Sequence, residues 1–557
     1  LAWAAGEVAA GAAAATLAAL QRQTPMDAAT ARRVGALLHA GGDKARGLAT
    51  LLVAWSTTTR AGGPSTPAVP APPTPPAPVA TPSTAVTVSG RPVAIAEPLA
   101  PAVTRPRVLC WMPYGQWNLH ALQEMTILHG ARWRGAEVRY VLCDGAFAAC
   151  DMHWAAVRPR TAGACTVCRR IQDTQADGLR MPHEWLGDHL TPVERATAAD
   201  WAAALPAASL PTACWDDWAI GAWIISSVHS HHRINRIDPH DPVHEATLRA
   251  YLEAGLLVAF AMDRLLATWR PDVLLLFNGR QATPRVAFEL ARAAGIRVVT
   301  HERGWRNETL YLAENADCLS VTPLRSAWTA WRDAALTEEE FGATAQWLHD
   351  RAHGRGLNWR AFTAPPGAPA ALRRELGLRE AAPLVAVFTS SEDEYISCPD
   401  YASPFGTQER WLEATLAWAA TRPDVDVVVR VHPNTGGRVA NGANAGQLAW
   451  LQALAERAPR TVRFVWPDDT TSSYSLIEVA GLSLSYVSTV ALEHACRGGI
   501  ALTAAASTLS GHGFTEDVRD VADYAAQLDA LLAEDDPARR AARRRLAWRF
   551  AYFAVFR

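Results

Sequence analysis

Short apolar runs alternate with helix-length segments from residue 105 to the C-terminus, and this alternation restricts the fold more than any other feature of the chain. The first series comprises Arg107–Trp111, a helical stretch to Arg134, Val138–Cys143, Asp272–Phe277, Pro284–Ala294 and Ile296–Thr300. The second comprises expected strands at Leu384–Phe388, Val425–Val431, Val462–Val465 and Leu482–Val487, and expected helices near Glu409–Ala420, Gln447–Glu456 and Thr489–Arg497. Strand–helix–strand repeats of this kind build parallel sheets covered by helices. The sequence therefore predicts an α/β protein with two doubly wound Rossmann-type domains facing a cleft.

The chain before residue 105 differs in composition. Residues 1–60 hold alanine- and leucine-rich runs, which predict a small helical segment, and residues 61–104 are rich in proline and alanine, which predicts an extended linker. A Pro/Gly-rich patch near residue 366 separates the two α/β series. We therefore expect a first Rossmann-like domain at 105–365 and a second at 366–557, which includes a C-terminal helix.

Charge and cysteine content exclude several function classes. The 53 basic and 55 acidic side chains give a net charge of -2, so no global field favours nucleic acid. Lys44 is the only lysine, so the chain has no phosphate-binding loop ending in Gly-Lys and no Schiff-base lysine after the linker. Nine cysteines without a signal peptide do not predict a disulfide framework. We expect a cytoplasmic protein.

A polar turn follows one strand of the second series. His432, Pro433 and Asn434 come directly after the apolar run that ends at Val431. Ligands bind at the carboxyl ends of the strands in such sheets, where His432 can donate to a phosphate and Asn434 can fix the loop. An ordinary strand-to-loop turn remains the alternative.

Hydroxyl side chains cluster at two later positions. Ser473 lies in a Ser-Ser-Tyr-Ser run before a short helix, and Ser488 and Thr489 lead from a strand into a helix that carries Glu493. Hydroxyls at a helix start suit an anion, and Glu493 can accept hydrogen bonds from ribose hydroxyls. Plain serine or threonine helix caps are the alternative.

In this order, the motifs resemble the nucleotide-binding half of GT-B glycosyltransferases, and specifically the bacterial capsule polysaccharide biosynthesis group, which is related to Kdo- and sialyltransferase-type enzymes. Further segments agree with that group, namely Phe277–Arg280, His301–Gly304, Phe388–Tyr395 and the aromatic-basic tail Trp548–Phe553. The resemblance covers roughly residues 105–557 and implies that the first α/β domain binds the acceptor and the second binds the nucleotide sugar.

This resemblance implies a glycosyltransferase that moves a sugar from a nucleotide-sugar donor to a capsular or other surface polysaccharide or its lipid-linked primer. The donor is expected to be a CMP- or UDP-sugar, with no metal or other cofactor required for catalysis. The residues expected to bind it are His432, Asn434, Ser473, Ser488, Thr489, Glu493, Arg280 and Arg303. A sugar-nucleotide epimerase, a polyol-phosphate transferase and a non-catalytic capsule assembly or export factor remain alternatives.

Carboxylates after two strands are candidates for the general base. Glu302 follows the strand at Ile296–Thr300, and Glu392 and Asp393 follow the strand at Leu384–Phe388. A carboxylate beside the acceptor hydroxyl can take its proton. The alternatives are an ion pair between Glu302 and Arg303 or Arg280, and a solvated turn for the second set.

Two clusters of other ligand types complete the candidates. Cys143, Cys150, Cys165 and Cys168 permit a structural zinc or iron–sulfur site, with isolated buried thiols as the alternative. The histidine-rich segment 229–244 is expected to be a polar loop lining the cleft.

The arginine-rich C-terminal helix carries Phe550 and Phe553 at helical spacing. This pattern predicts a peripheral contact with the inner face of the cytoplasmic membrane, or else packing of the helix against the protein.

Overall fold

The computed structural model describes residues 87–88, 91–92, 105–153, 161, 163–357, 363–437 and 442–557. The predicted helical segment 1–60 lies outside the described residues, and so does most of the predicted linker. Within the linker, β1 (Thr87–Val88) pairs antiparallel with β2 (Arg91–Pro92).

The first α/β domain contains a six-stranded sheet in the order β5-β4-β3-β6-β7-β8. Its strands are β3 (Arg107–Met112), β4 (Glu137–Leu142), β5 (His183–Trp185), β6 (Val273–Phe277), β7 (Arg297–Arg303) and β8 (Leu310–Glu314). Its helices are α3 (Asn118–Trp133), α4 (Ala164–Gly178), α5 (Pro192–Ala204), α6 (Ile220–His232), α7 (Pro242–Trp269) and α8 (Ala282–Ala293), with short turns η1 (Leu186–His189) and η2 (Ala207–Thr212). Every neighbouring pair is parallel except β7 with β8.

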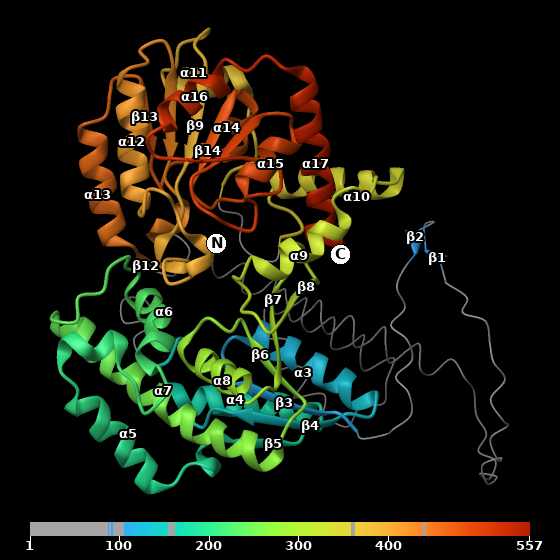
Figure 1. Cartoon of the computed structure of the whole chain (residues 1–557), viewed down its shortest axis with the longest axis vertical. Coiled ribbons are helices and arrows are strands. Elements are labelled where there is room, and N and C mark those ends of the chain that lie inside the picture. Colours follow the sequence, from blue (N-terminus) through green and yellow to red (C-terminus); the bar gives the residue numbers. More distant parts are fainter. Residues whose placement is uncertain are drawn as a thin grey trace, which may run out of the picture. The chain divides into compact units, whose positions relative to one another are not determined.

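The second domain, coloured from yellow to red in Figure 1, contains a sheet in the order β13-β10-β9-β14-β15-β16. Its strands are β9 (Leu384–Phe388), β10 (Asp426–Arg430), β13 (Val462–Val465), β14 (Leu482–Ser485), β15 (Ile500–Thr503) and β16 (Glu516–Asp517), all paired in parallel. Its helices are α11 (Pro369–Glu375), α12 (Gln408–Ala420), α13 (Ala445–Glu456), α14 (Ser473–Val479), α15 (Val490–Cys496), α16 (Tyr524–Leu532) and α17 (Pro537–Phe556). Short elements η3 (Glu392–Glu394), η4 (Pro399–Tyr401), η5 (Pro433–Thr435), β11 (Gly436–Gly437) and β12 (Gly442–Ala443) join them. Counted along the chain, both sheets have the strand order 3-2-1-4-5-6 of the Rossmann fold. The predicted pair of doubly wound, GT-B-like domains is confirmed.

Alternate side chains of each strand enter separate cores. Val385 and Val387 pack with α12, α13 and α16, whereas Ala386 and Phe388 pack with α11 and α14 on the other face. A sheet covered by helices on both faces has strands that are apolar throughout. This is why apolar runs marked the central strands in the sequence, whereas the less buried edge strands β5, β8 and β16 were not expected.

Helices α9 (Thr322–Trp331) and α10 (Glu338–Ala352) pack against the second domain. Trp328 of α9 and Trp347 of α10 share a hydrophobic cluster with buried residues of α15 and α17. The sequence placed these helices in the first domain, because nothing in their own pattern shows which core their apolar faces enter. Both helices therefore precede the boundary expected at 365/366 but pack with the second domain.

The C-terminal helix α17 buries the features that predicted a membrane contact. Phe550 and Phe553 lie in the hydrophobic cluster, and buried Arg543 binds Glu516 and Glu534. The packing alternative therefore describes this aromatic stripe, and the predicted membrane contact stays a prediction. Among the described residues, no helix has the length and apolar character needed to span a membrane.

Candidate functional site

A pocket of about 310 Å³ lies at the carboxyl edge of the second sheet. It borders the ends of β9, β10 and β14, and strand order reverses beside β9, which is where doubly wound sheets bind ligands. Gly304 and Trp305, which follow β7 of the first domain, also line it. The other lining residues are Arg351, Leu357, Thr363, Phe388, Thr389, Arg430, His432, Pro433, Ser473, Tyr474, Ser488, Thr489, Val490 and Glu493.

His432 has a defined orientation in this pocket. Its Nδ1 accepts a hydrogen bond from the Asn434 amide at 3.2 Å, and its own amide donates to Thr389 Oγ1 at 2.9 Å. Burial lowers the pKa of His432 to about 4, and the cationic side chains of Arg233 and Arg430 act in the same direction. The imidazole is therefore neutral at physiological pH and carries its proton on Nε2, as a donor.

Arg351 of α10 forms an ion pair and a hydrogen bond inside the pocket. Its Nε donates to Glu493 Oε1 at 2.5 Å, and its Nη2 donates to Thr489 Oγ1 at 3.0 Å. Glu493 is therefore already held by a guanidinium. The contact between Glu493 and a ribose stays a prediction, and a ribose bound there would lie next to the ion pair of Glu493 with Arg351.

The predicted hydroxyl residues Ser473, Ser488 and Thr489 all line the pocket. Thr489 forms no side-chain cap on α15, whereas Ser472, the neighbour of Ser473, caps α14. The serine cap considered for this part of the sequence is therefore present at Ser472, and at the start of α15 the Ser488 hydroxyl likewise accepts from the Val490 amide at 3.4 Å. The hydroxyl of Thr489 instead accepts from Arg351.

Asn434, Glu392 and Asp393 do not line the pocket. The Asn434 side chain donates to Glu394 Oε1 at 2.5 Å and so fixes the loop after β10, as predicted. Glu392 Oε2 accepts from Asn235 at 2.6 Å. These contacts tie the loop after β9 to its neighbours.

Asp393 is buried and paired with a cation. Its side chain is 1 % exposed, and Arg233 Nη1 donates to Asp393 Oδ2 at 2.5 Å. Burial raises the pKa of this carboxyl against the lowering effect of Arg233. The expectation that Glu392 and Asp393 act as a catalytic base or lie in a solvated turn is not supported, because both carboxyls are buried in hydrogen-bonded contacts with residues of the first domain.

Glu302 lies at the end of β7, two residues before the pocket wall begins at Gly304. Asn278 Nδ2 donates to Glu302 Oε2 at 2.7 Å, and the Arg303 amide donates to Glu302 Oε1 at 2.8 Å. The ion pair with Arg303 that the sequence allowed is present, with Nε at 3.4 Å. Burial acts to raise the pKa of Glu302, but His120 and Arg303 outweigh it and hold the pKa below its usual value.

His120 faces Glu302 from α3, and the sequence did not identify it. Its Nε2 is 4.0 Å from Glu302 Oε1, and its ring lies against Phe277 with centroids 3.9 Å apart. Burial lowers the pKa of His120 to about 4, so the ring is neutral beside an ionised carboxylate.

Arg280 and Arg303 lie outside the pocket lining. Arg280 Nη1 donates hydrogen bonds to Ser226 and Ser230 of α6, at 2.7 and 3.2 Å. Because Arg280 does not line the pocket, its predicted contact with the nucleotide sugar stays a prediction. The histidine-rich segment is a loop only at residues 233–241, because His229 to His232 end α6 and His244 lies on α7. His229 bonds the carbonyl of Ile234 and His232 bonds Thr247, so both rings serve local packing.

The four cysteines Cys143, Cys150, Cys165 and Cys168 line one small cavity of about 20 Å³. Backbone amides of Gly145 and Met152 donate to the sulfurs of Cys143 and Cys150. Burial raises the pKa of Cys143 to about 12. Within the described ranges, however, no group of three or more histidine, cysteine or acidic residues is arranged to hold a metal ion. The structure therefore does not support the metal site, and these four cysteines form no disulfide and are partly to fully buried.

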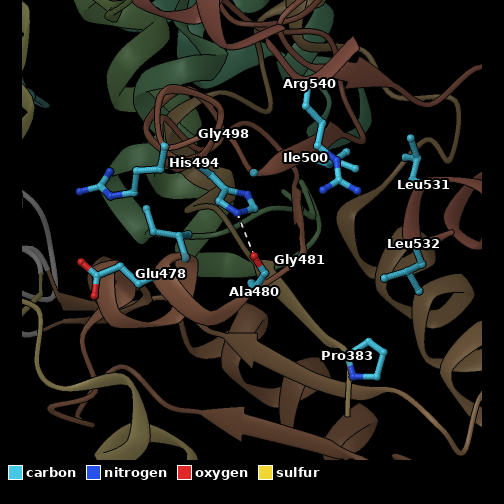
Figure 2. A pocket seen from close by; sticks show the side chains of 13 residues that line it. Pro383, Glu478, Ala480, Gly481, His494, Gly498, Ile500, Leu531, Leu532 and Arg540 are labelled. Carbon is cyan, nitrogen blue, oxygen red and sulfur yellow. Dashed lines mark hydrogen bonds between the residues drawn. The ribbon is translucent and has the colours of Figure 1, made fainter. Parts of the chain in front are cut away.

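A second pocket, of about 430 Å³, lies at the opposite, amino-terminal edge of the second sheet (Figure 2). His494 projects toward it, but its Nε2 bonds the Ala480 carbonyl at 3.1 Å and its Nδ1 bonds Ser483 at 2.7 Å. Because both ring nitrogens are engaged, His494 is a structural residue there, and the carboxyl-edge pocket is the candidate active site.

Three solved structures illustrate what this chain is similar to. A β-Kdo 2,4-transferase, KpsC of Thermosulfurimonas dismutans, is 15% identical over 50% of this chain and 78% of that chain, with a TM-score of 0.31. The glycosyltransferase SnogD of Streptomyces nogalater is 15% identical over 80% and 95%, with a TM-score of 0.26. A UDP-GlcNAc 2-epimerase of Methanocaldococcus jannaschii is 10% identical over 77% and 93%, with a TM-score of 0.28.

No protein-family model and no curated protein matches the chain. The three TM-scores lie below 0.5, so these likenesses assign neither a substrate nor a reaction. The strand order and the pocket residues of the chain itself define a GT-B-like fold with a candidate ligand site in its second domain.

Proposed function

We propose that this protein is a glycosyltransferase that binds a nucleotide sugar in the carboxyl-edge pocket and transfers the sugar to a capsular or other surface polysaccharide or its lipid-linked primer. The observation that carries the proposal is the convergence of Arg351, Arg430 and His432 with several hydroxyl side chains at the topological switch point of a Rossmann sheet. Cations and neutral donors of this kind suit a phosphate group.

The same residues would stabilise the leaving group. In the transfer, the bond between the anomeric carbon and the phosphate oxygen breaks, and the nucleotide leaves as an anion. Arg351 and Arg430 offset its charge, and His432 donates from Nε2. These positive charges provide a reason to expect transfer without a catalytic metal.

Glu302 is the carboxylate best placed to activate the acceptor. It is ionised, is held by Asn278 and Arg303, and lies two residues before the pocket wall. The acceptor hydroxyl would give its proton to Glu302 as its oxygen bonds the anomeric carbon. The first domain would thus supply the base and the second the donor site.

The test is calorimetric binding of CMP-, UDP- and GDP-sugars to the purified protein in the presence of a chelator, with His432→Ala as the variant. We expect one nucleotide class to bind and His432→Ala to weaken its binding at least ~10-fold, the loss typical of a charge-assisted hydrogen bond. His240→Ala is the matched control, because His240 is exposed and only its backbone amide forms a hydrogen bond, to Asp238.

Absence of binding by the wild-type protein, or equal binding by His432→Ala, would refute the proposed donor site. The bound nucleotide sugar is then incubated without acceptor and followed by NMR. Inversion of a sugar carbon under these conditions identifies an epimerase, whereas an intact donor that is consumed only when a glycan acceptor is added supports the transferase.

A further inference from the structure

Arg233 is a fully buried arginine that joins the two domains. It follows α6 of the first domain and adopts a left-handed conformation, with φ of 56°. Arg233 is 2% exposed. The hydrogen-bond acceptors of its guanidinium nevertheless lie in the second domain and not in the first. Its position is explained by what it contacts in the second domain.

The guanidinium reaches two loops at the carboxyl edge of the second sheet. Nη1 donates to Asp393 Oδ2 at 2.5 Å, and Nη2 donates to Ser391 Oγ at 3.2 Å, both in the loop after β9. Nη2 also donates to the Asn434 carbonyl at 2.8 Å, in the loop after β10. One side chain therefore fixes the spacing of these two loops.

Asn434, which accepts a hydrogen bond from Arg233, also donates one to His432. The Asn434 amide donates to His432 Nδ1, and this bond sets the tautomer and the direction of Nε2. The Asn434 side chain is in turn held by Glu394 of η3. Arg233 and Glu394 thus fix the peptide and the side chain of the residue that orients the histidine.

We propose that Arg233 is a positioning residue for His432, so that the donor site in the second domain is complete only when the first domain is docked on it. The proposal rests on the proposed function for the identity of the ligand. The docking itself involves further contacts of the first domain, in which Asn235 binds Glu392 and Ser230 Oγ donates to the Asp393 carbonyl at 3.4 Å. Nucleotide affinity is therefore coupled to domain docking through one guanidinium.

The charged groups around this contact come from several elements. Asp393 and Glu394 face Arg233 from η3, with Glu394 Oε1 at 3.9 Å from Nη1. Arg280 of the first domain acts on Asp393, and Arg430 of β10 acts on His432 together with Arg233. Removal of Arg233 therefore leaves Arg430 as the cation acting on the histidine.

The test variant is Arg233→Met combined with Asp393→Leu. Removing both members of a buried ion pair avoids an unpaired buried charge and so preserves folding better than a single change. The matched control is Arg543→Met with Glu534→Leu, which removes a comparably buried pair, with side chains 5% and 8% exposed, at α17. The first variant removes the donor to the Asn434 carbonyl, and the second leaves that donor in place.

Two measurements separate a positioning role from a general effect on stability. NMR of the ring nitrogens follows the tautomer and titration of His432 without any nucleotide, and calorimetry follows binding of the nucleotide sugar. We expect the Arg233 variant to shift His432 titration toward its ordinary range, to mix its tautomers and to weaken nucleotide binding ~10- to 100-fold, while the control changes neither.

An unchanged His432 tautomer and titration in the folded Arg233 variant would overturn the positioning role, whatever the protein binds. A changed His432 signal combined with no nucleotide binding by the wild-type protein would retain the positioning role and reject the proposed function. The two proposals thus fail in different measurements.

Discussion

Arg351 and Glu493 are 142 residues apart in the sequence and form an ion pair of 2.5 Å inside the candidate donor pocket. Glu493 is 2% exposed at its side chain and Arg351 22%, so the pair closes one wall of the pocket while the guanidinium remains accessible to a ligand. The pairing also explains how an acidic residue is tolerated in a pocket assigned to a phosphate, because Arg351 offsets its charge.

We expect Arg351→Met to destabilise the fold and to weaken nucleotide binding. Breaking a buried ion pair by removing one partner costs about 3–5 kcal/mol, since it leaves an uncompensated charge, and Glu493 would then repel the phosphate. Denaturant unfolding and calorimetry measure the two effects. Addition of Glu493→Gln is expected to restore stability but not binding, because the donor group is still missing. Recovery of binding in the double variant would show that Arg351 only neutralises Glu493.

We expect Glu302→Gln to lower kcat by about 10²–10⁴-fold with little change in KM for the donor, because a general base acts on the acceptor and not on the nucleotide. The pKa of Glu302 lies below its usual value, so the carboxylate is ionised at neutral pH and activity is lost only as pH falls through that lowered pKa. Initial rates between pH 4 and 8 measure both effects. Glu314→Gln, at an exposed position on β8, is the control, and an equal loss of kcat there would argue against a base.

We expect the protein to lose stability as pH rises through the acidic range because of Glu392. Burial is the main cause that raises the pKa of Glu392 to about 7 from 4.5. A carboxyl whose pKa is higher in the folded than in the unfolded state favours folding when protonated, so stability falls between about pH 4.5 and 7. Glu392→Gln removes this loss and is expected to stabilise the protein at pH 8 by at most ~3 kcal/mol, with no gain at pH 4.5. Urea unfolding at both pH values tests this, and an equal gain at both would contradict the titration.

We expect Phe550→Ala to reduce the free energy of unfolding by about 3–5 kcal/mol, the usual cost of removing a large buried aromatic side chain. Phe550 is 0% exposed and contacts Trp328, His512 and Phe514. The exposed Arg545 on the same helix provides the control, and Arg545→Ala should change stability by less than about 0.5 kcal/mol. Similar effects of the two changes would mean that α17 does not pack as described.

Most strands of the two sheets were predictable from the sequence to within a few residues, whereas the edge strands β5, β8 and β16 were not expected. Leu384–Phe388 and Val462–Val465 have the same bounds as β9 and β13. The central strand β9 is apolar and buried at every position because helices cover both faces of the sheet, whereas the edge strand β13 has buried valines at its two ends and an exposed Arg463 between them. The polar residues at strand ends were predictable for a related reason: parallel strands present their carboxyl ends at one edge. His432, Ser488 and Thr489 therefore reach one pocket.

The partners of those residues were decided by tertiary structure alone. Arg233 directly follows α6 and Arg351 lies on α10, and both side chains reach the site because these two helices pack where they do. Helix packing also places Arg233 against the buried Asp393 and buries Phe550 in a hydrophobic cluster. Local sequence determines which segments form strands and helices through their hydrophobic pattern, whereas contacts between distant segments depend on which helix faces meet, and this is settled only when the chain is folded.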